Sequence, residues 1–173
     1  MCRLAFVPKT VLKPKELKAI LKELEESFGG HGNGIGYWKR TGKKVEPFVA
    51  KSDNVEIGEL KGKVQFPFIF HTRFASYGYK SRENTHPFYV RGSKEEFIGA
   101  HNGTLNKDVF AALYWQLRWH GIKLEGDTDS EVVFRTAGEL GLDVLEELSG
   151  VFLVLKKSKN EAIVYNNSCL LYT

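Results

Sequence analysis

The chain has 173 residues, a formal net charge of +4, 42% hydrophobic residues and 27% charged residues. No apolar run approaches the roughly 18 residues of a membrane span, no signal sequence precedes Cys2, and the lysines are interleaved with glutamates rather than gathered into a basic stripe. We therefore expect one cytoplasmic domain over residues 1–173 that binds neither a membrane nor nucleic acid. A chain of this length can bury enough apolar surface to fold without disulfides or a structural metal.

The two cysteines, Cys2 and Cys169, stand at opposite ends of the chain. They could form one disulfide that ties the termini together, or remain two free thiols. A reducing cytoplasm favours free thiols.

Hydrophobic periodicity in the first half predicts a strand, a helix, a hairpin and a second strand. The helix starts at Pro14, and its apolar residues recur at helical spacing up to a glycine pair. Glycines at 30–38 indicate either close backbone approach at a site or a flexible hairpin loop. The predicted elements are a strand at 2–7, a helix from Pro14 to Gly29, a hairpin that continues to Phe48-Val49, and a central strand at 64–75 whose Pro67 must lie at its edge or start.

The second half predicts a polar loop, one strand, helices and closing strands. Asn102-Gly103 is a strong hairpin-turn signal at the end of its strand. The elements are a loop at 78–85, a strand at 97–105, helices at 106–119 and 129–140, a shorter helical piece at 142–148, and strands at 151–155, 162–165 and 169–172. The mixed order without repeats or a linker predicts an α+β fold with a largely antiparallel sheet.

Four polar clusters lie around these elements, and each has an ordinary structural explanation. Arg73 can pair with a surface carboxylate, the histidines can be buried structural residues, and Asn102-Gly103 can be only a turn. Thr128 and Glu131 fit a helix capping box. The clusters are His71-Thr72-Arg73 with Ser76, Asn84-Thr85-His86, His101-Asn102-Gly103 and Asp127 to Glu131.

Together the clusters fit a site for an amino acid with a reactive side-chain amide. Arg73 suits an α-carboxylate, and Asp129 in the first turn of a helix suits an α-ammonium group. The Asn102 side-chain amide and the Gly103 backbone N–H can form an oxyanion hole. Removal of Met1 would leave Cys2 with a thiol and an α-amine of pKa about 7.7–8.0, which is a nucleophile with its own base.

At these residues the chain resembles the class II glutamine amidotransferase domain, an N-terminal-nucleophile hydrolase, and above all its small stand-alone members. Five blocks carry the resemblance in order: Met1-Cys2, H-T-R-F-A-S at 71–76, N-T-H-P-F at 84–88, A-H-N-G at 100–103 and G-D-T-D-S-E at 126–131. The resemblance implies a four-layer αββα sandwich of two antiparallel sheets between helical layers.

The resemblance also implies residue roles. Cys2 is the nucleophile, Asn102 and Gly103 form the oxyanion hole, and Arg73 and Asp129 hold the α-carboxylate and α-ammonium of glutamine. It places Ser76 and His86 near the substrate. Tyr77 departs from the synthetase-linked members, where a histidine is usual, which weakens any inference about coupling to a partner domain.

The sequence leaves several functions open. The first is a glutaminase or amidotransferase that forms a γ-glutamyl thioester and releases ammonia, with no cofactor or metal, to a separate synthetase subunit. A γ-glutamyl amide hydrolase acting on a small γ-glutamyl compound and a silent module that binds glutamine or a partner are the alternatives. A metal-dependent hydrolase using His71, His86 and His101 is a rival, although their spacing is not that of a compact ligand motif. A homodimer is also left open.

Overall fold

The computed structural model describes residues 2–9, 13–27, 29–52, 64–76, 78–157 and 161–167. Met1, Tyr77, Cys169 and the predicted strand at 169–172 lie outside the described residues. The elements are β1 (Arg3–Val7), α1 (Pro14–Ser27), β2 (Asn33–Thr41), β3 (Lys44–Ser52), β4 (Phe68–Thr72), β5 (Phe88–Arg91), β6 (Glu96–Asn102), α2 (Lys107–Trp119), α3 (Asp129–Leu140), the 3₁₀ helix η1 (Leu142–Glu147), β7 (Val151–Lys156) and β8 (Ala162–Asn166).

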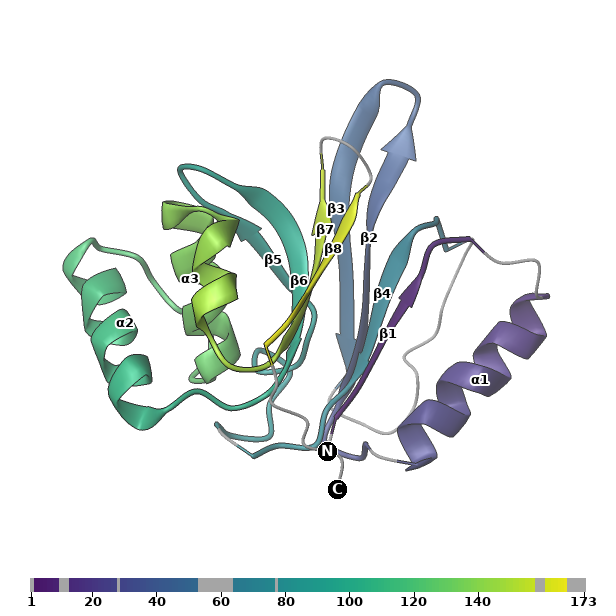
Figure 1. Ribbon diagram of the computed structural model, residues 1–173. Helices are drawn as coiled ribbons and strands as arrows, with labels where there is room; N and C mark the ends of the chain where they lie inside the picture. The colour runs from purple at the N-terminus through teal and green to yellow at the C-terminus, as the bar shows by residue number, and fades with distance from the viewer. Residues whose placement is uncertain are drawn as a thin grey trace.

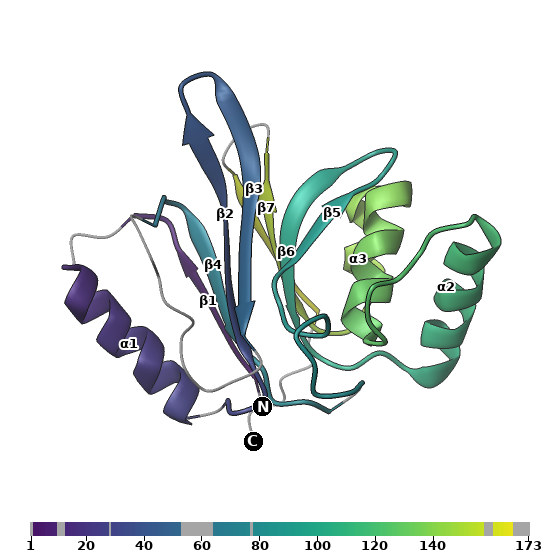
Figure 2. The same ribbon diagram turned by 180° about the vertical axis from the view of Figure 1, so that it is seen from behind.

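The strands form two four-stranded antiparallel sheets, ordered β1-β4-β2-β3 and β5-β6-β7-β8. Figures 1 and 2 show α1 against the outer face of the first sheet and α3 against the outer face of the second, with α2 outside α3. The two sheets face each other between these helical layers. The α+β four-layer αββα sandwich predicted from the sequence is therefore confirmed.

Three apolar clusters fill the spaces between the four layers. Leu21 of α1 packs with Phe68 and Phe70 on one side of the first sheet. Ile69, between those two phenylalanines in β4, packs instead with Ile98 and other residues of the second sheet. The third cluster joins the outer face of the second sheet to α3 and η1. This alternation is what a strand covered on both faces requires, because successive side chains point to opposite sides.

Two glycines of β2 let the sheets approach each other closely. A Cβ at Gly34 would meet the backbone carbonyl of His86, and a Cβ at Gly36 would lie 2.7 Å from the side chains of Pro87 and Ile98. The glycine-dense segment therefore reflects close backbone approach, one of its two sequence interpretations. Residues 33–38 are a buried strand, and only the short stretch before them is loop.

Most predicted elements are present with small shifts in their bounds. The strand expected at 64–75 is shorter, since β4 begins just after Pro67. The hairpin turn expected at Asn102-Gly103 is wrong, because β6 leads into α2 and pairs with β5 and β7 instead. The sequence analysis also missed β5. Thr128 is the predicted N-cap of α3, and its side chain accepts a hydrogen bond from the Glu131 backbone N–H at 3.3 Å.

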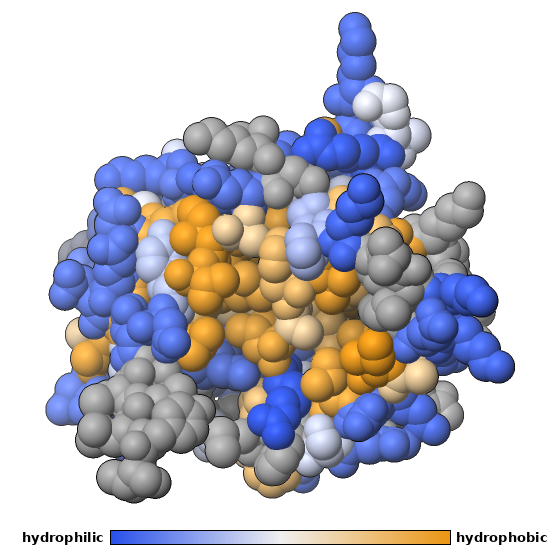
Figure 3. Space-filling model, turned by 45° about the vertical axis from the view of Figure 1, so that its right-hand side comes forward, coloured by the Kyte–Doolittle hydropathy of each residue, from blue (hydrophilic) through white to orange (hydrophobic). Residues whose placement is uncertain are grey.

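The surface combines apolar and charged areas. Figure 3, turned so that the right-hand side of Figure 1 comes forward, shows hydrophobic residues gathered in the middle of this face with hydrophilic residues around them. Within the described ranges, no helix is long and apolar enough to cross a membrane.

Candidate active site

Strand alternation places two predicted site residues in the space between the sheets. In β1, Leu4 and Phe6 face the second sheet, so Cys2 just before the strand has the same parity. In β4, Ile69 faces the second sheet. Arg73 lies four positions further on, so the same alternation turns it toward the same side. Because Arg3 is paired with Thr72 in the antiparallel ladder, Cys2 and Arg73 are neighbours at one end of it.

The Cys2 thiol is free, partly exposed and held by the backbone of the segment after β4. Its Sγ accepts a hydrogen bond from the Phe74 N–H at 3.2 Å and lies 3.4 Å from the Phe74 carbonyl oxygen. The Phe74 backbone thus fixes the position of the sulfur.

Asn102 reaches Cys2 from the opposite sheet. Its Nδ2 donates to the Cys2 carbonyl oxygen at 3.3 Å, and its Oδ1 lies 3.1 Å from Nε2 of His71. An amide oxygen can only accept, so Nε2 of His71 must carry the hydrogen. His71 thereby fixes the amide with its N–H groups toward Cys2, which is the orientation an oxyanion hole requires.

Gly103 follows Asn102 in a crowded position. A Cβ there would meet Nε2 of His101 and would lie 3.0 Å from the Cα of Gly150. Gly103 is not among the glycines with positive φ. Close approach of its neighbours, rather than a hairpin turn, therefore explains why a glycine stands here.

Arg73 is buried, with 3% of its surface exposed. Its guanidinium donates to the carbonyl oxygens of Tyr79 at 2.8 Å and Gly78 at 3.5 Å. Burial lowers the pKa of Arg73, whereas Cys2, Asp127 and Asp129 act in the opposite direction. A guanidinium stays charged under such shifts, so Arg73 supplies a fixed positive charge beside the thiol.

Asp129 is the first residue of α3 and is also buried. Its Oδ2 accepts from the Leu105 N–H and its Oδ1 from the Ser130 N–H, both at 2.8 Å. A carboxylate has about four lone-pair sites, so these two contacts position the group and leave it able to accept from a ligand. Asp129 and Arg73 line the same pocket as opposite charges.

Ser76 and His86 line that pocket as well. The Ser76 hydroxyl lies 3.3 Å from the Thr104 hydroxyl at the exposed rim. His86 is buried, its ring lies 4.2 Å from that of His71 between centroids, and neither of its nitrogens has a hydrogen-bond partner among the described residues. Ser76 thus stands at the entrance of the pocket and His86 in its wall.

Three buried histidines lie in or next to this pocket, of which His86 and His101 line it. Burial lowers the pKa of His71 to about 3 and that of His101 to about 4, and it holds the pKa of His86 well below its ordinary value. His101 also contacts the Ser130 hydroxyl at 2.9 Å and stacks on Phe152. All three rings are therefore neutral at physiological pH, and the positive charge of the pocket comes from Arg73.

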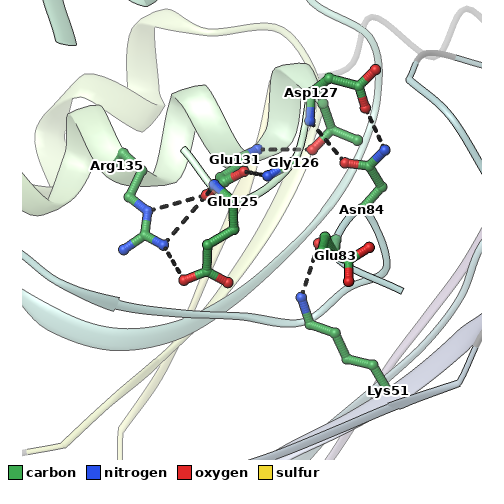
Figure 4. A network of polar contacts seen from close by, with 9 residues as sticks. Lys51, Glu83, Asn84, Glu125, Gly126, Asp127, Glu131 and Arg135 are labelled. Carbon is green, nitrogen blue, oxygen red and sulfur yellow. Dashed lines mark hydrogen bonds and ion pairs between the residues drawn. The ribbon is translucent and has the colours of Figure 1, made fainter. Parts of the chain in front are cut away.

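A polar network holds the loop that leads into α3 (Figure 4). Asn84 accepts from the Asp127 N–H at 2.9 Å and donates to the Asp127 carboxylate. The buried Glu131 carboxylate accepts from the Glu125 and Gly126 N–H groups at 2.9 and 2.7 Å. In a standard capping box, the carboxylate at this position accepts from the N–H of the N-cap residue, which is Thr128 here. The Glu131 carboxylate instead accepts from two residues that precede the N-cap. The network fixes the loop from both sides and so positions Asp129.

The sequence analysis assigned no role to two charged or ionisable residues near the site. His31, in the glycine-dense segment, accepts from the Ala75 N–H at 2.9 Å and stacks on Phe74 at 4.6 Å. Lys51 donates to the Glu83 carbonyl at 3.1 Å, lies over the Phe88 ring, and has its pKa lowered to about 8 by burial. For His31, the sequence did offer one signal of a possible role, since an ionisable side chain stands between two glycines. Nothing in the local sequence distinguishes Lys51.

The pocket itself is small in this structure. Its volume is about 30 Å³, and its lining includes Cys2, Arg73, Gly103 and Asp129. This volume is well below the roughly 300–1,000 Å³ of known ligand pockets. No group of three histidine, cysteine, aspartate or glutamate side chains in the described part of the chain is arranged to hold a metal ion.

Two opposed antiparallel sheets between helical layers are the architecture of the N-terminal-nucleophile hydrolase fold. The solved glutamine phosphoribosylpyrophosphate amidotransferase from B. subtilis, complexed with ADP and GMP, has this fold. It superposes with a TM-score of 0.65 at 21% identity, over 95% of this chain and 36% of that one.

Sequence comparison identifies the family. The family described as "Glutamine amidotransferases class-II" matches residues 20–145, and the chain belongs to it. Glutamine–fructose-6-phosphate aminotransferase [isomerizing] of Francisella tularensis subsp. tularensis is 30% identical over 135 residues, which are 76% of this chain and 20% of the relative. Amidophosphoribosyltransferase of Methanocaldococcus jannaschii is 29% identical over 143 residues, covering 80% of this chain and 28% of that protein. The matched part of the chain thus spans only 20% and 28% of the lengths of these two relatives.

Proposed function

We propose that this protein releases ammonia from the side-chain amide of glutamine, with Cys2 as the nucleophile. The observation that supports it best is the convergence of Cys2, Arg73, Gly103 and Asp129 on one pocket from distant parts of the chain, with the Asn102 amide held at Cys2. Family membership makes glutamine the first substrate to test.

The chemical steps follow from this arrangement. After Met1 is removed, the Cys2 α-amine takes the thiol proton, and the sulfur attacks the carboxamide carbon. The negative charge that develops on the amide oxygen is stabilised by the Gly103 N–H and by the second N–H of the Asn102 amide. The carbon–nitrogen bond then breaks. The α-ammonium group of Cys2 returns its proton to the departing nitrogen, which leaves as ammonia. Water hydrolyses the γ-glutamyl thioester to glutamate and restores the thiol.

The remaining pocket residues would bind the amino-acid end of glutamine. Arg73 presents a buried positive charge to the α-carboxylate, and Asp129 accepts from the α-ammonium. Ser76 at the rim and His86 in the wall would contact the substrate between these ends. Because the pocket holds only about 30 Å³, we expect the segment around Phe74 to move on binding.

The fate of the ammonia separates the two main versions of this proposal. The long relatives have most of their length outside the region matched here, and their names describe transfer to a sugar phosphate or a phosphoribosyl compound. In the first version, a separate synthetase subunit would accept the ammonia that this chain releases. If water is the only acceptor, the protein is a γ-glutamyl amide hydrolase.

The test combines intact mass spectrometry with a glutamate-release assay. We expect a mass that lacks Met1, labelling of Cys2 by an electrophilic glutamine analogue, and loss of both labelling and turnover in Cys2→Ala. A matched form that carries a cleavable extension before Cys2 keeps the thiol but blocks the α-amine. It should gain activity only after cleavage.

Wild-type turnover in Cys2→Ala would refute the scheme. Glutamine binding without turnover in the processed protein would instead favour a silent binding module. Faster cleavage of another γ-glutamyl compound would favour the hydrolase.

A further inference from the structure

The outer helix α2 has two apolar faces, and among the described residues only one of them packs against other elements. Its inner face, with the buried Leu117 and the partly buried Phe110 and Leu113, packs toward α3 and the third core cluster. On the opposite side, Trp115 is 68% exposed and Trp119 is 88% exposed. These two tryptophans are one helical turn apart and therefore neighbours on the surface.

Four further exposed residues complete this surface, which we call the α2 stripe. At helical spacing, Ala111 and Ala112 lie one turn before Trp115, Asp108 lies at the start of the stripe and Arg118 at its end. The stripe thus has two alanines and Trp115 in its middle, Asp108 at one end, and Arg118 with Trp119 at the other. Figures 1 and 2 show α2 at the edge of the molecule, farthest from α1, so a second molecule can reach it.

We propose that the α2 stripe is the interface of a twofold homodimer in which the α2 helices of two copies pack antiparallel. With the axis at the middle of the helix, Asp108 of each copy faces Arg118 of the other. The same register sets Trp115 against Ala111 and Ala112 of the second copy, where the small side chains leave room for the indole. A twofold interface must be self-complementary, and the stripe is so in both charge and size.

The exposed area is enough for a weak dimer. A tryptophan side chain buries 150–250 Å², so at their observed exposures the two tryptophans offer about 300 Å² in each copy. The pair of copies then buries about 600 Å² from the tryptophans alone. The other stripe residues bring the total to about 1,000 Å², the lower limit for a specific interface. Interfaces of this size are typically weak, so we expect a reversible monomer–dimer equilibrium rather than a permanent dimer.

The proposal is independent of the glutaminase scheme, because none of the six stripe residues lines the site pocket. Sedimentation velocity across a concentration series should show a monomer–dimer equilibrium. The double variant Trp115→Ala/Trp119→Ala should shift it at least tenfold toward monomer. Ile20→Ala, which removes an exposed apolar side chain from α1, is the matched control and should leave it unchanged.

Charge reversal tests the antiparallel register. Asp108→Arg and Arg118→Asp should each weaken the dimer, and the double reversal should restore it. Circular dichroism of each variant checks that α2 still folds. A wild-type protein that stays monomeric up to about 1 mM overturns the proposal and points to a different partner for the stripe. A dimer insensitive to the tryptophan variant, or a double reversal as weak as the single ones, overturns it as well.

Discussion

Lowering the pH from about 7 to about 5 should destabilise the protein through its three buried histidines. Burial lowers the pKa of His71 to about 3, that of His101 to about 4 and that of His86 well below 6.5. The native state therefore binds fewer protons than the unfolded chain once the pH falls below about 6.5. The stability from these groups is fully present above that value and is lost as the pH falls toward the folded-state pKa values.

The magnitude follows from the proton uptake of the unfolded chain. At about pH 5, His71 and His101, which titrate at about 6.5 when unfolded and at about 3 and about 4 when folded, each lower the stability by about 2 kcal/mol. These two costs add to about 4 kcal/mol while the native rings stay neutral. His86, whose pKa burial also lowers, adds a cost of the same sign. Glu25 acts in the opposite direction, because burial raises its pKa and so favours the native state on acidification. Since total stabilities are about 5–15 kcal/mol, the loss brings the protein close to unfolding.

Urea denaturation at the two pH values measures this loss. His86→Leu is the informative variant, since His86 has no hydrogen-bond partner among the described residues and its removal breaks no such contact. It should reduce the difference in unfolding free energy between the two pH values. Leu145→Ala, in the core against α3, should lower stability by about 2–5 kcal/mol at both pH values and leave the difference unchanged. An identical difference in wild type and His86→Leu would refute the reasoning.

Three further predictions concern the site and the packing of the sheets. Asn102→Ala should lower the glutaminase rate about 10²–10³-fold while the circular dichroism spectrum stays that of the wild type, and an unchanged rate would remove Asn102 from the oxyanion hole. Arg73→Lys keeps the charge but loses the fork, so we expect KM for glutamine to rise more than kcat falls; a change confined to kcat would contradict carboxylate binding. Gly36→Ala places a methyl group 2.7 Å from Pro87 and Ile98, so urea denaturation should show a loss of about 1–3 kcal/mol, and a neutral result would mean that the sheets can separate locally.

Local sequence signals predicted most of the fold because the periodicity of apolar residues and the capping residues of helices are visible in the local sequence. Pro14 opens α1, Thr128 caps α3, and the alternating residues of β4 face two different cores. The failure at Asn102-Gly103 has a physical cause. The dipeptide is a common hairpin turn, but here the glycine is required by the nearby His101 and Gly150, contacts that no local pattern reveals.

The sequence by itself determined the types and order of the polar residues, and with them the resemblance to the class II glutamine amidotransferases. Only the tertiary structure decided which of these residues meet. Pairing of β1 with β4 sets Cys2 beside Arg73, and packing of one sheet on the other brings Asn102 to Cys2 with His71 fixing its amide. The tertiary structure also decided that the tryptophans of α2 face outward. Both outcomes depend on contacts between segments far apart in the chain, whereas sequence periodicity reports only on neighbours along it.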